Sequence, residues 1–193
     1  MNTVEARKLV TAELSDRTSA GKRVYSPRTW PISLPSYPAI LVSAPAEHKT
    51  SLGRHSPQFT TITTILIDGR VLCYDDDTET SNGAGEAWEA AEILRVETER
   101  ALIGNPAIRR KFQQIAAIRS QTTVDSDGEA HFGQFLMEMD FEYYQAMEDF
   151  FPAETHQLCE VNVKGVHPAF ELSFNLCPDE GAPGESGSET ERK

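Results

Sequence analysis

The chain has 193 residues, of which 39% are hydrophobic and 25% charged, a composition that predicts one globular domain with a real core. Thirty acidic residues against 18 lysines and arginines give a formal charge of -12, which disfavours binding to nucleic acid phosphates over most of the surface. No apolar run approaches the roughly 20 residues that cross a bilayer, and charges interrupt the first helix-like segment. We therefore expect no membrane segment, no signal peptide and a product that stays in the cytoplasm.

The beginning of the chain predicts a helix followed by a proline-rich connector. Asn2 and Glu5 have the spacing of a capping box, and the helix is expected to end near residues 19–21. A short strand follows at Val24–Tyr25, and four prolines between residues 27 and 38 exclude regular structure there, because proline lacks an amide donor. The apolar residues of the predicted helix recur at helical spacing: Ala6, Leu9, Val10 and Leu14.

Two strands and a long loop are predicted next. Ala39–Ser43 is a short apolar strand, and a polar loop from Ala44 to Gln58 leads to a second strand at Phe59–Asp68, which Val71–Tyr74 continues or ends. Neither face of the second strand is strongly polar. This pattern is typical of a central strand that is covered on both sides.

Two helical segments follow an acidic run at residues 75–79. The first is long, from Ala84 to about Ile103, and a second, starting at Asn105-Pro106, is expected to stop near Ile118. Ile93 and Val96 lie opposite the main apolar stripe of the long helix. That stripe consists of seven residues: Ala84, Ala87, Trp88, Ala91, Leu94, Ala101 and Leu102.

The last third of the chain carries the clearest strand pattern. A hairpin is predicted from Thr122–Val124, a turn at Asp125–Gly128, and Phe132–Tyr144, where apolar and acidic residues alternate. After a linker or short helix broken at Pro152, Phe170–Leu176 is predicted as a final strand. The five apolar residues of the hairpin's second arm predict a core face: Phe135, Met137, Met139, Phe141 and Tyr143.

These elements predict an α+β protein, with a mixed, mainly antiparallel sheet flanked by two or three helices in a single domain over residues 1–177. Residues 178–193 consist mainly of Gly, Glu, Ser and Pro, which cannot bury enough apolar surface to offset the entropy of ordering. An acidic, disordered tail is therefore expected. The three cysteines are odd in number and widely spaced, which favours reduced thiols.

The residue patterns of the common catalytic and metal sites are missing from the sequence. Gly83-Ala84-Gly85 begins a dinucleotide fingerprint, but Trp88 stands at the third glycine position and the acidic run upstream would repel a pyrophosphate. There is no Gly-Lys-Ser/Thr phosphate loop, no Cys-x-x-Cys and no His-Glu-x-x-His, and the acidic run lacks the ligand spacing of a calcium loop. His156 and Cys159 provide two ligands, too few for a zinc site. We predict no enzymatic activity, no cofactor and no metal.

A local positive region is one candidate for protein contacts. The predicted loop from Ala44 to Gln58 has no acidic residue after Glu47, although the chain as a whole is acidic, and it can dock on an acidic partner. The alternative is an ordinary solvated loop, and the two interpretations carry about equal weight. The candidate residues are His48, Lys49, Arg54 and His55.

The second candidate is the outer side of the long predicted helix. Ile93 and Val96 lie there as apolar residues away from the main stripe. Either they are core positions of a helix buried on two sides, or they belong to a subunit interface, which we favour.

Several segments together resemble one family. The proline-rich entry and strand RVYSPRTWPISLPSYPAILV at Arg23–Val42, the strand FTTITTILI at Phe59–Ile67, the helix Glu86–Gly104 with its Asn105-Pro106 stop, and the strand Gly133–Tyr143 follow in order. This order resembles the tail terminator proteins of long-tailed bacteriophages, the minor tail protein U type. The similarity covers most of residues 3–176.

The resemblance implies a fold, a function and a location. Members of that family have a mixed sheet flanked by helices, and they form hexameric rings that cap the tail tube, end its polymerisation and provide the surface for joining the head. The resemblance implies no enzymatic activity and three partners: further copies of the chain, the tail tube protein and a head-completion or neck protein. It places the protein at the head-proximal end of the virion's tail, and in the host cytoplasm during assembly. It assigns no individual functional residue.

Two alternatives remain open. The chain is a head-completion or neck connector protein of the same virion, or it is a small cytosolic α+β ligand-binding domain or enzyme whose site is assembled from scattered residues. Formation of a ring with a bore separates the first two interpretations from the third. Binding to tail tube protein, and not to the portal-side ring, separates the tail terminator from the neck protein.

Overall fold

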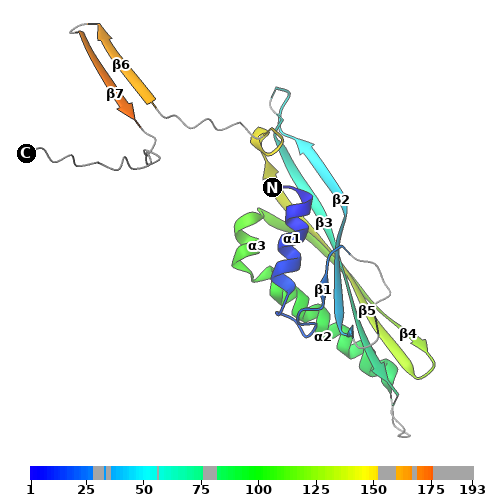
Figure 1. The fold of residues 1–193 in the computed structure, drawn as a ribbon. Helices are drawn as coiled ribbons and strands as arrows, with labels where there is room; N and C mark the ends of the chain where they lie inside the picture. The colour runs from blue at the N-terminus through cyan, green and yellow to red at the C-terminus, as the bar shows by residue number, and fades with distance from the viewer. Residues whose placement is uncertain are drawn as a thin grey trace, which may run out of the picture. The chain divides into compact units, whose positions relative to one another are not determined.

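The computed structural model describes residues 1–27, 33, 36–55, 57–75 and 82–151, together with the backbone of two strands at 160–166 and 169–175. The chain divides into two compact units, Met1–Phe151 and Pro152–Lys193. In the first unit, helices pack on a five-stranded sheet (Figure 1), so the predicted α+β class with a mixed, mainly antiparallel sheet is confirmed.

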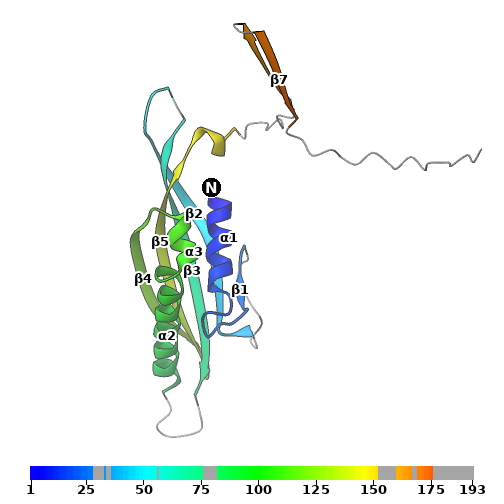
Figure 2. The same cartoon turned by 90° about the vertical axis from the view of Figure 1, so that its left-hand side faces the viewer.

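The strand order of this sheet is β1-β2-β3-β5-β4, in which β1 runs parallel to β2 and the other neighbours are antiparallel. The three α-helices lie on one face of the sheet (Figure 2). The strand β3 is central, as predicted. Its even-numbered side chains are half-buried on the other face, however, so the expectation of cover on both faces is wrong for the described residues. In chain order the elements are α1 (Thr3–Leu14), β1 (Val24–Tyr25), β2 (Ala39–Ser51), β3 (Phe59–Tyr74), α2 (Gly83–Ile103), α3 (Pro106–Lys111), β4 (Gln114–Asp127), β5 (Ala130–Gln145) and the 3-10 turn η2 (Met147–Asp149).

The helix α1 begins as predicted and ends early. Its capping box is formed, since the Glu5 amide donates to Asn2 Oδ1 at 2.9 Å and the Asn2 amide donates to Glu5 Oε2 at 3.1 Å. The helix stops at Leu14, five residues before the predicted end, because Asp16 adopts a left-handed conformation with φ 60°. The short strand β1 is present as predicted.

The long loop predicted between the first two strands is for the most part strand. β2 continues to Ser51, and only residues 52–58 separate it from β3. Its register against β3 shifts between Ser43 and Ala46, where Pro45 lies. A bulge absorbs a proline that cannot donate to the ladder, so the strand continues beyond it.

The second predicted helix is also shorter than expected. Asn105 caps α3 by accepting from the Ala107 amide at 2.8 Å, but the helix ends at Lys111 and the edge strand β4 starts at Gln114. Ile108 and Phe112 are buried as the helical spacing predicts. From Gln114 onward the backbone pairs with β5, and this long-range pairing prevails over the helical period.

The β4–β5 hairpin is confirmed and is longer than predicted. Its tight turn lies at residues 128–129, where Gly128 takes the positive φ of 64° that glycine tolerates. In β5 the predicted core residues point to the helices, while Glu138, Asp140 and Glu142 occupy the open face of the sheet.

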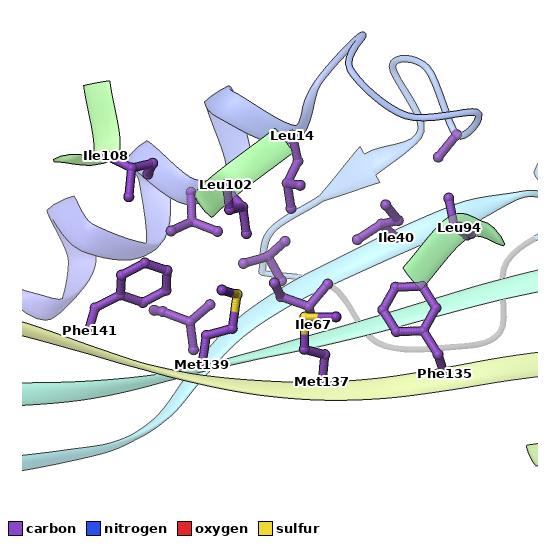
Figure 3. Close-up of a cluster of buried hydrophobic side chains, with 14 of the residues drawn as sticks. Leu14, Ile40, Ile67, Leu94, Leu102, Ile108, Phe135, Met137, Met139 and Phe141 are labelled. Atoms are coloured by element: carbon purple, nitrogen blue, oxygen red, sulfur yellow. The ribbon is translucent and has the colours of Figure 1, made fainter. Parts of the chain in front are cut away.

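The core lies between this sheet and the helices (Figure 3). The helix α2 contributes Ala87, Ala91, Leu94 and Leu102, as the predicted stripe requires, whereas Trp88 is 44% exposed and does not belong to it. Where α2 crosses the sheet, Gly133 of β5 allows the Ala87 carbonyl to approach closely.

The second unit contains a two-stranded antiparallel sheet of β6 (Glu160–Val166) and β7 (Ala169–Asn175). The strand β7 corresponds to the predicted final strand, and β6 falls in a segment for which no strand was predicted. The expected disorder of residues 178–193 and the pair His156 and Cys159 lie outside the described residues. Among the cysteines, Cys73 is described as a free thiol, in line with the predicted reduced state.

Candidate interaction surfaces

The predicted positive region is divided between strand and turn. His48 and Lys49 lie in β2 and, as neighbours in a strand, point to opposite faces, while Arg54 and His55 are exposed in the turn that follows. Lys49 Nζ lies 3.4 Å from Glu47 Oε2 and 5.0 Å from the centre of the Phe150 ring. The prediction of one continuous loop from Ala44 to Gln58 is therefore wrong, because β2 extends to Ser51 and strand geometry separates the side chains. Glu47 also pairs with Lys49. The role of these residues in docking on a partner stays a prediction.

Glu47 belongs to a polar cluster beneath the start of α1. Its carboxylate accepts hydrogen bonds from the hydroxyls of Thr3 and Tyr143, the latter at 3.3 Å, and Tyr143 also contacts Thr63 at 3.0 Å. Burial raises the pKa of Glu47, but the hydrogen bond from Thr3 and the charge of Lys49 outweigh it, and the net pKa is lowered. Burial raises the pKa of Tyr143. This cluster attaches α1 to the sheet.

The outer face of α2 is an exposed surface of mixed character, as the second candidate required. Ile93 is 51% exposed and Val96 is half-buried, so neither is a core position. They line a hollow of about 480 Å³ that extends along the helix from Glu89 to Arg100. Ile103, 47% exposed, continues the apolar surface toward α3. The placement of these residues agrees with the sequence interpretation, and their role as a subunit interface stays a prediction.

A basic segment that the sequence interpretation overlooked follows this surface. Between Glu99 and Asp125 the chain has no acidic residue and five basic ones, three of them consecutive and exposed on α3. The signal for it in the sequence is this run of 25 residues without Asp or Glu in a chain that is acidic as a whole. The five residues are Arg100, Arg109, Arg110, Lys111 and Arg119.

The structure also brings the hydroxyl and imidazole of two hairpin residues together with a carboxylate that lies far from them in the sequence. Ser126 Oγ is 2.8 Å from His131 Nδ1, and His131 Nε2 is 3.0 Å from Asp75 Oδ2. An ionised carboxylate only accepts, so Nε2 donates to Asp75; in the neutral imidazole Nδ1 then accepts from the Ser126 hydroxyl. Asp75 Oδ1 in turn accepts from the Gly83 amide at 3.0 Å.

This chain of hydrogen bonds connects the tip of the hairpin to the start of α2. Ser126 and His131 are paired across the hairpin, so the contact between them could have been predicted from the strand register. Asp75, by contrast, belongs to the acidic run that was interpreted as a solvated loop. Asp125, Asp127 and Glu129, which neighbour the serine in the chain, are exposed, and their negative charge opposes the oxyanion that nucleophilic catalysis creates. The arrangement is therefore best explained as a structural clasp.

The described residues contain no cluster of three or more His, Cys, Asp or Glu side chains placed to hold a metal ion. Within the same residues, no helix has the length and apolar character needed to span a membrane. No protein-family model matches the chain, and no curated protein matches its sequence.

Proposed function

We propose that this chain is a structural protein of the phage tail-terminator type. Copies of it form a closed ring, expected to be a hexamer, on the head-proximal end of a tail tube. The ring ends tube polymerisation and presents a docking surface to a head-completion or neck protein. The segments that resemble this family support the proposal, and so does an α+β fold of the class that the family has.

The observation that carries the proposal is the pair of open edges on the five-stranded sheet. The strand β4 has 14 residues and pairs with β5 on one side only, and among the described residues the outer side of β2 has no partner strand beyond Leu41. Unpaired amides and carbonyls at an edge are a template for pairing with another chain. Because the two edges lie on opposite sides of one sheet, they favour head-to-tail contacts, which form a ring when the rotation between neighbouring copies closes and a filament when it does not.

The composition of β4 supports its use in a contact. From Phe112 to Val124 the one charged residue is Arg119, which is bound to Glu138 at 3.0 Å and to Asp140 at 3.1 Å. The segment also lacks proline and glycine. Charges and prolines are two of the usual protections of a free edge, and apart from Arg119 this segment has neither; its one irregularity is a register shift between Ile115 and Ala117. Most of the edge is therefore open to pairing with another chain.

The net charge of -12 makes ring assembly depend on the tube end. Like-charged copies repel one another in solution, and a tube end that binds several of them raises their local concentration. Ring closure is then expected on the tube and disfavoured away from it.

Mass in solution tests the proposal. Light scattering and native mass spectrometry of the full chain, alone and with purified tail tube protein, should detect a hexamer, either free or on tube ends. A chain that gains no mass with tubes would refute the proposal. Binding to the portal-side ring without binding to tubes would favour the neck protein instead.

Lys49 near the end of β2 and Arg54 in the turn that follows provide a variant for the docking step. Lys49→Glu together with Arg54→Glu should impair docking while the protein stays folded, measured as tail length by electron microscopy and as folding by circular dichroism. The matched control is Lys8→Glu with Lys22→Glu, which changes the charge equally at two other exposed positions. Normal tail length with the first pair would remove Lys49 and Arg54 from the docking surface.

A further inference from the structure

The outer stripe of α2 carries acidic residues toward one end and a basic residue toward the other, so it is complementary to a second copy of itself in the reverse direction. Along it lie Glu89, Glu92, Val96, Arg100 and Ile103. The positions are seven and four residues before Val96, and four and seven after it, so they occupy one side of the helix. Acidic residues precede Val96, and a basic and an apolar residue follow it.

We infer that two copies of this chain associate through α2, with the helices antiparallel and Val96 on the twofold axis. In that arrangement Glu92 of each copy lies opposite Arg100 of the other, and the two Val96 side chains meet. A parallel arrangement would place Glu92 against Glu92 and Arg100 against Arg100, which is repulsive. The charge order along the helix therefore selects the antiparallel pair and a second copy as the occupant.

The local contacts leave these charges free to pair. Arg95 is engaged with Glu99 at 2.7 Å, and Glu97 accepts from the Ser19 amide at 2.7 Å. By contrast, within the part of the chain that the structure describes, the side chains of Glu89, Glu92 and Arg100 form no hydrogen bond or ion pair. All three side chains are exposed.

Apolar surface lies where such a contact needs it. Ile93 and Val96 line the hollow of about 480 Å³ on this face, and Ile103 is 47% exposed one turn beyond Arg100. A single helix face is smaller than the roughly 800 Å² per partner of a stable complex. We therefore expect a weak dimer that forms at high protein concentration and dissociates on dilution.

This contact is separate from the ring of the proposed function. A twofold contact uses the same surface on both copies and closes on itself, whereas ring contacts join two different surfaces. The dimer is therefore expected for the chain alone, without tail tube protein, and its test does not depend on the proposed function.

Charge reversal tests the contact in solution. Sedimentation velocity over a range of concentrations, at low and high salt, should detect a salt-sensitive dimer. Glu92→Arg alone and Arg100→Glu alone should each raise the dissociation constant about tenfold or more, because two attractive pairs become repulsive. The double variant E92R/R100E should restore the wild-type constant. A monomer under all conditions, or a double variant no better than the single ones, would overturn the inference.

A disulfide tests the geometry. Facing helices 8–10 Å apart, each with a Cα radius of about 2.3 Å, place two Cα atoms on the axis about 3.4–5.4 Å from each other, which overlaps the range of a disulfide. Val96→Cys should thus give a crosslinked dimer under mild oxidation, with the bond mapped to residue 96 by peptide mass spectrometry. Wild-type chain is the baseline for the native cysteines.

Glu89→Cys is the matched control on the same stripe. In an antiparallel pair the two residues at position 89 lie about 21 Å apart along the axis, so no crosslink is expected. Crosslinking at position 89 equal to that at 96 would indicate a parallel or random encounter and overturn the inference.

Discussion

Gly133 of β5 faces the backbone of α2, and replacing it with alanine should push the helix away from the sheet. A Cβ atom at this position would lie 2.1 Å from the Ala87 carbonyl oxygen and 2.8 Å from Val71 Cγ2. Ordinary contact begins at 3.4 Å, so the carbonyl is too close by 1.3 Å. Because that atom belongs to the helix backbone, no side-chain rotation relieves the clash.

The loss of stability depends on the side chains that α2 buries against the sheet. A shift of the helix loosens the packing of its buried residues against the sheet, and overpacking of this kind costs about 1–3 kcal/mol. Alanine also lowers the conformational entropy of the unfolded chain, and this effect offsets about 0.4–1 kcal/mol of the loss in stability. We expect Gly133→Ala to lower the free energy of unfolding by about 1–2 kcal/mol. The buried residues of α2 are Gly83, Ala87, Ala91, Leu94, Thr98 and Leu102.

Urea unfolding followed by far-UV circular dichroism measures this difference. Gly53→Ala is the control, since a Cβ there meets nothing within 4 Å and the residue is not in the left-handed region. The control should remain within about 0.5 kcal/mol of the wild type. A Gly133→Ala protein as stable as the control would refute the assigned approach of α2 to β5.

Three further predictions concern polar groups. Replacing His131 with alanine removes the clasp between the hairpin and α2 and should cost about 1–3 kcal/mol in the same urea assay, more than Ser126→Ala at the exposed end; equal losses would contradict the central place of the imidazole. Because the pKa of Glu47 is lowered in the fold, its carboxylate stabilises the protein above the ordinary pKa of 4.5, and this stabilisation is lost as the pH falls through the folded-state value. Glu47→Gln should therefore flatten the acid side of the melting temperature profile, and an unchanged slope would remove Glu47 as its cause. Burial and then the charge of Glu86 raise the pKa of Cys73, so alkylation of this thiol at neutral pH should be slow and should quicken in Glu86→Gln; a rate unaffected by that change would exclude the charge effect.

Local patterns were sufficient where one segment contains the whole interaction. The capping box of Asn2 and Glu5, the alternation of β5 and the glycine turn of the hairpin each involve neighbours within a few residues. The exposure of Ile93 followed from helical periodicity alone. The α+β class was predictable for the same reason, because it depends on which periods occur and in what order.

Errors arose where a distant partner decides the outcome. The strand β2 continues past Pro45 because β3 offers a ladder and a bulge accommodates the proline, and β4 starts at Gln114 because β5 satisfies its backbone. The divided positive region has the same origin, since the strand sends His48 and Lys49 to opposite faces.

The sequence by itself determined the class of the fold, the main core faces and the exposed side of α2, because periodicity and capping act within a segment. Only the tertiary structure decided how far the edge strands extend, which charges are neutralised, and that Ser126, His131 and Asp75 meet. Those outcomes depend on hydrogen bonds and packing between residues far apart in the chain, and the free energy of such contacts has no local signature in the sequence.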